Sequence, residues 1–304
     1  MKNTLIIVLV IAVVGLGAYV LLKNPPKSAV LAPEQSAPIG TTTPSSGEIA
    51  TTTEQKKEAT VIGTSVEGRA ITAYHYGTGS DEVLFIGDIH GGYTPGTALL
   101  AYKAMEYFKE NVEVIPKNLS VTIIPVMNPD GLSSTVGTTT GNFTQADIPS
   151  SQATQIAGRF NANKVDLNRN FDCTWKPTAV WEGKTVSGGT GAFSEPESQA
   201  IRNYIQSHKP KAVVVWYASE GGVYASSCGS AALSETLALT RAYATATGYT
   251  AHETYSGYPI PGDMTNWLAQ IGTPAISVLL KSRLDSDWTN NLAGIKTVLS
   301  YYAR

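Results

Sequence analysis

The chain has few of the residues that most often carry acid–base and metal chemistry. Its 304 residues include four histidines and two cysteines, and no glutamate follows Trp267. The formal net charge is −2, so there is no basic excess to displace the counterions of a nucleic acid. A nucleic-acid binder driven by bulk charge is therefore excluded. There is also no glycine-rich phosphate loop, since the pair Gly221-Gly222 lacks the flanking residues of such a motif.

The N-terminal part of the chain differs in composition from the rest. Residues 4–22 carry no charge and are long enough to cross a bilayer as a helix, and no small-residue cleavage site follows them. After a short tail at residues 1–3, this segment predicts a transmembrane signal anchor. Residues 23–58 are rich in Thr, Ser and Pro, which predicts a flexible linker. We therefore expect a single-pass membrane protein with an extracytoplasmic domain at residues 59–304.

Within that domain, short apolar runs alternate with segments of helical periodicity. Strands are expected at 61–76 (a hairpin), 82–87, 119–126, 211–218 and 274–280, and helices around 98–108, 195–205, 231–247 and 290–302. A turn is expected at Asn128-Pro129-Asp130-Gly131. This alternation predicts an α/β fold with a largely parallel sheet covered by helices on both faces. Such sheets bind ligands beyond the carboxyl ends of their strands, and His90, Asn128, Tyr217 and Leu280 lie near such ends.

Five motifs occur in an order that resembles the carboxypeptidase A-like zinc metallopeptidases, the M14 family. They are Gly63–Arg69 (GTSVEGR), His90-Gly91-Gly92, Asn128–Gly131 (NPDG), Val165–Phe171 (VDLNRNF) preceded by Arg159 and Asn161, and Phe193–Glu197 (FSEPE). The likeness covers roughly residues 61–302 and continues through Tyr258, Trp267 and Leu280. It implies a mixed eight-stranded sheet between helices.

The chain departs from the family at the positions that would hold zinc. The resemblance places the first metal ligand at His90, but a tyrosine, Tyr93, stands where the family has a glutamate three residues later. Tyr217 stands where the family has its second histidine, and Leu279 stands at the position of the catalytic glutamate. A shift of one residue would place Leu280 there instead, so that no alignment restores the carboxylate.

These replacements remove the parts on which the family's chemistry depends. A catalytic zinc needs about three protein ligands and an open water position, and His90 supplies one. Tyrosine, with a pKa of ~10, is a poor ligand while it is protonated. Without the metal, water is not acidified, and without the glutamate no general base acts on it. We therefore expect no cofactor and a pseudopeptidase rather than an enzyme.

The positions that grip the substrate in the family are retained. The resemblance assigns the terminal carboxylate of a peptide to Arg159, Asn168, Arg169 and Tyr258, and the floor of the specificity pocket to Thr265. A guanidinium pairs with a carboxylate through two parallel hydrogen bonds, which is strong and directional. The expected partner is the C-terminus of a peptide or of a peptidoglycan stem peptide. Alternatively, these residues have a structural role and connect strands and loops instead of binding a ligand.

Other interpretations stay open. In an oxidising compartment Cys173 and Cys228 could form a disulfide or remain two separate buried thiols. An active zinc carboxypeptidase with a rewired metal site is one alternative function, and a purely structural scaffold is another.

Two rewired metal sites are conceivable. Asp88, on the same side of a straight strand as His90, could join His90 and Glu220 in a metal site. Tyr93 and Tyr217 with His90 also resemble the ferric-ion ligands of the transferrin family.

Overall fold

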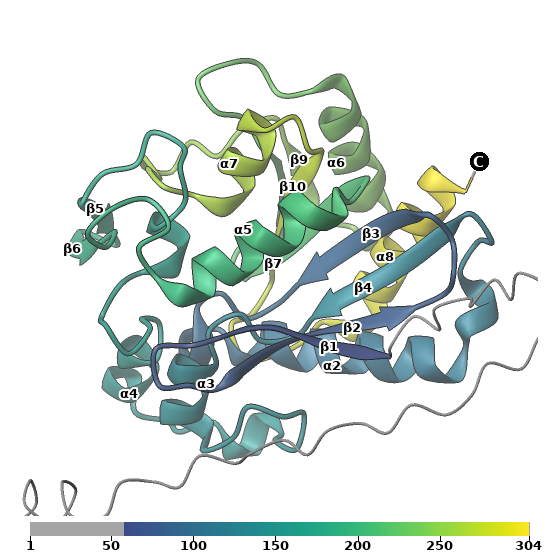
Figure 1. The fold of residues 1–304 in the computed structure, drawn as a ribbon. Helices are drawn as coiled ribbons and strands as arrows, with labels where there is room; N and C mark the ends of the chain where they lie inside the picture. Colours follow the sequence, from purple (N-terminus) through teal and green to yellow (C-terminus); the bar gives the residue numbers. More distant parts are fainter. Residues whose placement is uncertain (1–57, 304) are drawn as a thin grey trace, which may run out of the picture. The chain divides into compact units, whose positions relative to one another are not determined.

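The computed structural model describes residues 58–303, and its centre is a mixed eight-stranded sheet (Figure 1). The predicted anchor, residues 4–22, and residues 23–57 of the predicted linker lie outside the described residues. The strands run in the order β1-β2-β4-β3-β7-β10-β8-β9. Their bounds are Ala59–Thr64 (β1), Ala70–Tyr76 (β2), Asp81–Ile86 (β3), Leu119–Ile124 (β4), Ala212–Ala218 (β7), Gly222–Ala225 (β8), Thr250–His252 (β9) and Ala275–Leu280 (β10).

The middle of the sheet is parallel and its margins are mixed. Strand β3 is parallel to both β4 and β7, and β7 is parallel to β10. Antiparallel pairs join β1 to β2, β2 to β4 and β10 to β8. Leu279 of β10 pairs with Tyr217 of β7. The register therefore brings two of the three positions that differ from the family side by side at the carboxyl end of the parallel strands.

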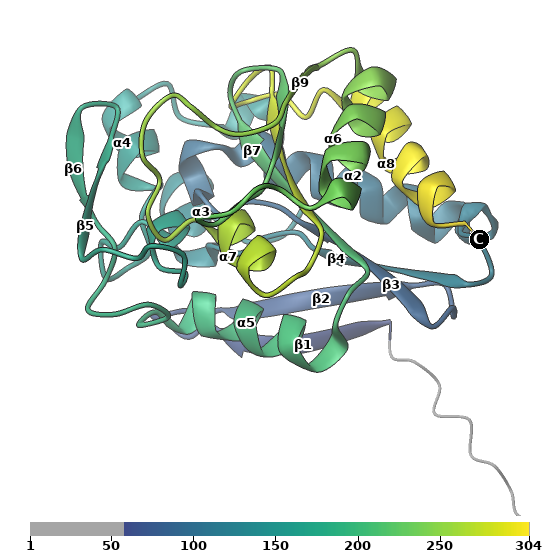
Figure 2. The ribbon, with the colours of Figure 1, turned by 90° about the horizontal axis from the view of Figure 1, so that it is seen from above.

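Helices cover both faces of the sheet, as the alternation of strands and helices predicts (Figure 2). The helices are α2 (Pro95–Glu110), α3 (Pro129–Val136), α4 (Gln152–Ala157), α5 (Pro196–His208), α6 (Ser234–Thr247), α7 (Met264–Gln270) and α8 (Trp288–Tyr302). Short 3-10 turns occur at Gly91–Tyr93, Val112–Val114, Gln145–Asp147 and Leu167–Arg169.

Alternate side chains of the central strands pack into two separate hydrophobic cores, one on each face of the sheet. On one face Phe85 and Trp216 pack with α2, α6 and α8. On the other face Ile86 and Tyr217 pack with α5 and α7. Because side chains of a strand alternate between faces, this division follows directly from the continuous apolar runs of β3 and β7. Tyr217 thus lies on the face covered by α5 and α7.

The structure differs from the predictions at several short elements. The segment Asn128–Gly131, predicted as a turn, begins helix α3: the Asn128 side chain accepts from the backbone N–H of Gly131, at 3.0 Å, as a helix N-cap. The strands β8 and β9, of four and three residues, carry too little periodicity to be recognised. A separate hairpin of β5 (Thr178–Trp181) and β6 (Lys184–Ser187) is likewise missing from the predictions. No helix within residues 58–303 has the length and hydropathy needed to span a membrane.

Candidate functional site

A pocket of about 260 Å³ lies at the carboxyl ends of β3, β7 and β10. This is the edge at which open parallel sheets place their ligands. All nine positions that the family resemblance singles out line it: His90, Tyr93, Arg159, Asn168, Arg169, Tyr217, Tyr258, Thr265 and Leu279. Leu280 is instead fully buried in the core on the face covered by α2, α6 and α8. The register therefore leaves Leu279 as the residue that faces the pocket.

A buried ion pair forms one side of the site. Both Nε and Nη2 of Arg159 donate to Oδ2 of Asp166, at 3.0 and 2.8 Å, and Asp166 is fully buried. The guanidinium also lies over the Trp181 ring, 4.2 Å from its centroid. Burial alone would raise the pKa of Asp166, but the charges of Arg159 and then of Arg169 outweigh it and lower that pKa to about 2. Arg159 is therefore neutralised from within the protein.

The depressed pKa of Asp166 predicts a loss of stability in acid. The unfolded chain takes up this proton near the ordinary value of 3.8, whereas the folded protein holds the carboxylate ionised down to about pH 2. The stabilisation is thus complete above about pH 5 and is lost as the pH falls toward 2, by about 2 kcal/mol in total. Urea unfolding at a series of pH values measures it. In the Asp166→Asn variant this part of the pH dependence should disappear, and an unchanged acid profile would contradict the assignment.

His90 lies in the pocket wall without a hydrogen-bond partner. Its side chain is buried, and neither Nδ1 nor Nε2 is hydrogen-bonded among the described residues. The nearest carboxylate oxygen is Oδ1 of Asp166, 3.7 Å from Nε2, which is beyond hydrogen-bond range. Burial, followed by the charge of Arg159, lowers the pKa of His90 well below its usual value, although Asp166 acts in the opposite direction. The imidazole is therefore neutral at pH 7.

The two tyrosines at the lost metal-ligand positions have other partners. The Tyr93 hydroxyl donates to Oε1 of Glu182, at the tip of the β5–β6 hairpin, at 3.0 Å. The Tyr217 hydroxyl donates to Oδ1 of Asn168 at 3.2 Å. Burial is the first cause that raises the pKa of each phenol, well above the usual value for Tyr217. Both stay protonated at neutral pH and serve as hydrogen-bond donors.

This donor set does not fit a zinc ion. It offers one imidazole, two protonated phenols engaged elsewhere and, at the fourth family position, a leucine, whereas a catalytic zinc needs about three ligands. Because the Tyr93 and Tyr217 hydroxyls make these contacts, the site does not fit a ferric ion of the transferrin kind either. No group of three His, Cys, Asp or Glu side chains within the described residues is arranged to hold a metal.

The alternative metal site built on Asp88, His90 and Glu220 is wrong. Strand β3 ends at Ile86, and Asp88 has a left-handed backbone with φ of 56°. The alternation of a straight strand therefore does not reach it, and its fully buried side chain is not part of the pocket lining. Burial raises the pKa of Asp88 well above its usual value, which disfavours the charged form that a metal would bind. Glu220 does line the pocket, but apart from Asp88.

Arg169 differs from Arg159 because no carboxylate of the described residues forms an ion pair with it. It is buried, its Nη1 donates to the backbone carbonyl of Asn168 at 2.7 Å, and its Nε has no partner in the part of the chain that the structure describes. The Tyr258 ring lies 6.0 Å from its guanidinium carbon. A buried cation with unused hydrogen-bonding capacity beside a pocket is suited to bind an anion.

Asn168, in contrast, makes three side-chain hydrogen bonds within the protein. Its Nδ2 donates to Oδ2 of Asp263 at 2.8 Å, and its Oδ1 accepts from the Tyr217 hydroxyl and from the backbone N–H of Met264, at 3.1 Å. The side chain therefore joins β7 to the start of α7. For Asn168 the geometry favours a structural role over direct contact with a ligand.

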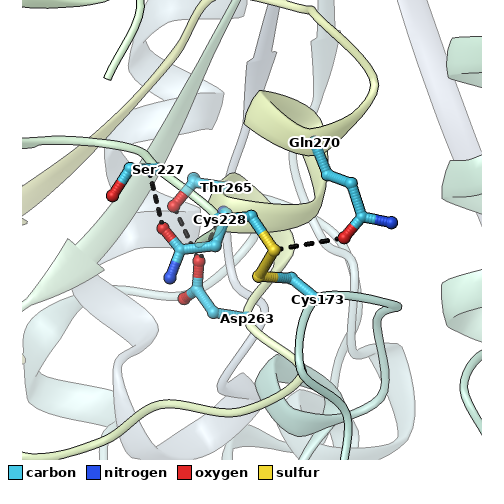
Figure 3. Close-up of a disulfide and its surroundings, with 7 residues drawn as sticks. Cys173, Ser227, Cys228, Asp263, Thr265 and Gln270 are labelled. Atoms are coloured by element: carbon cyan, nitrogen blue, oxygen red, sulfur yellow. Dashed lines mark hydrogen bonds between the residues drawn. A yellow bond between two sulfur atoms is a disulfide. The ribbon is translucent and has the colours of Figure 1, made fainter. Parts of the chain in front are cut away.

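The pocket floor is polar and is fastened by a disulfide (Figure 3). The Thr265 hydroxyl donates to Oδ1 of Asp263 at 2.8 Å, and the backbone N–H of Ser227 donates to the Asn266 side chain at 3.1 Å. The sulfur atoms of Cys173 and Cys228 lie at bonding distance, with the Cα atoms 6.0 Å apart. The disulfide thus connects the segment after Arg169 to the loop that carries Ser227.

Reduction of this disulfide is expected to weaken ligand binding several-fold, because Ser227 and the floor at Asn266 then lose their covalent connection to the Arg169 segment. Calorimetry of a short free-acid peptide with and without a phosphine reductant measures the effect. The double variant Cys173→Ser/Cys228→Ser should bind as the reduced protein does and should not respond to the reductant. Equal affinity of the oxidised and reduced protein, both folded, would refute a role of the disulfide in the pocket.

Several residues of the site had no role in the sequence-based prediction. Asp166 stands inside the VDLNRNF motif, and Asp263 directly precedes a helix, where an aspartate is a typical N-cap. These two signals were available in the sequence. Trp181 and Glu182 belong to the unpredicted hairpin, and no signal in the sequence indicates that it folds back onto Tyr93.

The family model and the curated relatives that match this chain indicate the same family. A model of the peptidase family M14, described as zinc carboxypeptidase, matches residues 47–293. Carboxypeptidase E of Caenorhabditis elegans is 34% identical over 124 residues, which are 36% of this chain and 24% of that protein. The catalytic chain of human carboxypeptidase N is 30% identical over 123 residues, 36% of this chain and 25% of that protein. The matches thus span about a quarter of the length of these relatives.

Solved structures show the same fold at low sequence identity. Bovine thrombin-activatable fibrinolysis inhibitor, in complex with a tick carboxypeptidase inhibitor, has a TM-score of 0.64 at 17% identity, covering 80% of this chain and 89% of that one. Murein-tripeptide amidase from Escherichia coli O157 has a TM-score of 0.56 at 19% identity, covering 80% and 92%. Both likenesses concern the fold.

Proposed function

This chain belongs to the zinc carboxypeptidase family, M14, and on that premise we propose that it is a non-catalytic member that binds peptides by their C-terminal carboxylate. The observation that carries the proposal is Arg169, a buried guanidinium that lines the pocket and has no carboxylate partner within residues 58–303. A terminal carboxylate supplies the missing anion. The metal-ligand and catalytic positions next to it hold Tyr93, Tyr217 and Leu279, which provide neither zinc ligation nor a general base.

We further propose that the domain, residues 59–304, acts outside the cytoplasm and is tethered to the membrane by residues 4–22 through the linker at 23–58. The pairing of Cys173 with Cys228 supports this location, because disulfides persist in oxidising compartments. Stem peptides of peptidoglycan are one source of free carboxyl termini there. The fold shared with a murein-tripeptide amidase supports this class of ligand. The polar floor at Thr265 favours a small or polar terminal side chain.

An active zinc carboxypeptidase is the second candidate, and its basis is membership of a family that is normally zinc-dependent. It requires a metal and a base that the residues around His90 do not provide. Stoichiometric zinc together with chelator-sensitive release of terminal amino acids would establish it. A purely structural domain is the remaining possibility, and it predicts no change in any binding property on Arg159→Ala.

The proposal is tested by calorimetry with pairs of short peptides that differ only in a free or an amidated C-terminus. We expect the free acid to bind at least about thirtyfold tighter, because the amide cannot form the charge-assisted hydrogen bonds to Arg169. The titrations are made in the presence of a chelator, so that metal does not contribute. Equal affinity for acid and amide would reject C-terminal recognition.

A further inference from the structure

His90 is the second buried side chain in the pocket with unused hydrogen bonds. It is 5% exposed, it lines the pocket, and both of its ring nitrogens lack a partner among residues 58–303. A buried polar group left without a hydrogen-bond partner carries the full cost of losing its contacts with water. Two such atoms on one side chain in a ligand pocket point to a ligand group that satisfies them.

The described residues 58–303 offer His90 no hydrogen-bond partner. Oδ1 of Asp166 accepts from the backbone N–H of Asn168 at 3.1 Å and lies 3.7 Å from Nε2 of His90, which is too far for a hydrogen bond. The Tyr217 ring lies 5.7 Å away between centroids, and its hydroxyl is directed to Asn168. A neutral imidazole has one N–H donor and one bare acceptor nitrogen. The partner must therefore bring both kinds of group or accept a single bond from His90.

We propose that His90 hydrogen-bonds the last peptide group of the ligand, next to the carboxylate that Arg169 binds, and thereby selects a peptide over a free amino acid. The inference rests on the proposed function of the same pocket. A peptide group carries one N–H donor and one carbonyl acceptor, and it is separated from the terminal carboxylate by a single Cα atom. His90 and Arg169 line the same pocket, and the charge of Arg169 acts on the His90 imidazole, so we place the terminal residue of the ligand between them. His90, at the position of the family's first metal ligand, would thus recognise the peptide instead of a metal.

The experiment compares three acetylated dipeptide ligands: the free acid, the same acid with the last amide replaced by an ester, and the C-terminal amide. The ester lacks the N–H and has a weaker carbonyl acceptor, but it keeps the carboxylate and the side chains. The proteins are the wild type, His90→Leu and His90→Gln, because glutamine retains a donor and an acceptor. All titrations are made once with chelator and once with added zinc.

We expect the wild type to bind the peptide about tenfold tighter than the ester. His90→Leu should lose about tenfold for the peptide and should no longer distinguish it from the ester, whereas His90→Gln should keep part of the discrimination. A residue with only a structural role would weaken both ligands equally. If His90→Leu does not fold, the ligand series on the wild type and His90→Gln decides.

The outcomes separate this inference from the function on which it rests. Equal binding of peptide and ester by the wild type, both tighter than the amidated ligand, overturns the role of His90 and leaves C-terminal recognition standing. Equal binding of acid and amidated peptide overturns C-terminal recognition itself. Binding that appears only with zinc and is abolished by chelator means that His90 acts through a metal, and it overturns the inference as well.

Discussion

Replacing Asp166 with asparagine is expected to destabilise the domain by about 3–5 kcal/mol, because the change leaves Arg159 buried without its counter-charge. Asp166 is fully buried and accepts two hydrogen bonds from that guanidinium. The asparagine carbonyl oxygen can replace Oδ2, but its amide nitrogen cannot accept from the Asn168 backbone N–H as Oδ1 does, and the charge is no longer neutralised. Urea unfolding followed by circular dichroism at pH 7 measures the change in the free energy of unfolding, with an unchanged denaturant slope.

Two further variants make this result specific. Asp81 forms an exposed ion pair with Lys211, 3.6 Å long, and Asp81→Asn should cost less than about 1 kcal/mol. The double variant Arg159→Met/Asp166→Leu removes both charges and should recover most of the stability lost in Asp166→Asn. A loss below about 1 kcal/mol in Asp166→Asn would contradict the view that this ion pair holds the site together.

Replacing Arg169 with methionine is expected to weaken ligand binding strongly and to change the stability of the domain little. The affinity for a free-acid peptide should fall by about 2–5 kcal/mol, roughly thirtyfold to several-thousandfold, because the cation that pairs with the carboxylate is gone. Stability should change little, because the removal of a buried cation with an unpaired Nε offsets the loss of its favourable charge interaction with Asp166. Calorimetry and thermal unfolding of the same sample measure the two quantities.

The matched control is Arg241→Met. Arg241 is exposed, pairs with Glu253 at 3.2 Å and lies outside the pocket lining, so that neither affinity nor stability should change appreciably. The amidated peptide is expected to bind Arg169→Met and the wild type alike. Undiminished binding of the free acid by Arg169→Met would exclude this residue as the carboxylate grip.

The sequence predicts the framework of the fold because the framework depends on local apolar patterns. The continuous apolar runs of β3, β4, β7 and β10 identify buried strands, and the helices between them imply parallel connections. Strands β8 and β9 are too short for such a pattern. They exist because their backbones pair with β10 and with each other, which is a tertiary effect.

For the site, the motifs identify which residues line the pocket but not what each one does. Arg159 and Arg169 carry the same chemical group, yet one is neutralised by a neighbour seven residues away and the other has no carboxylate partner. Asn168, predicted to bind the ligand carboxylate, is hydrogen-bonded to Asp263 and Tyr217. These differences depend on side-chain directions in the folded state, which the spacing of residues along the chain does not specify.

The most direct test of the account is the zinc content of the purified domain, expressed without a tag, equilibrated with zinc at pH 7 and dialysed. Elemental analysis should find well below about 0.1 zinc per chain, because His90 is a single ligand. The variant Tyr93→Glu/Tyr217→His restores the family's ligand set, and it should retain close to one. One zinc per wild-type chain, with an ion seated against His90 in a crystal of the same sample, would contradict the account.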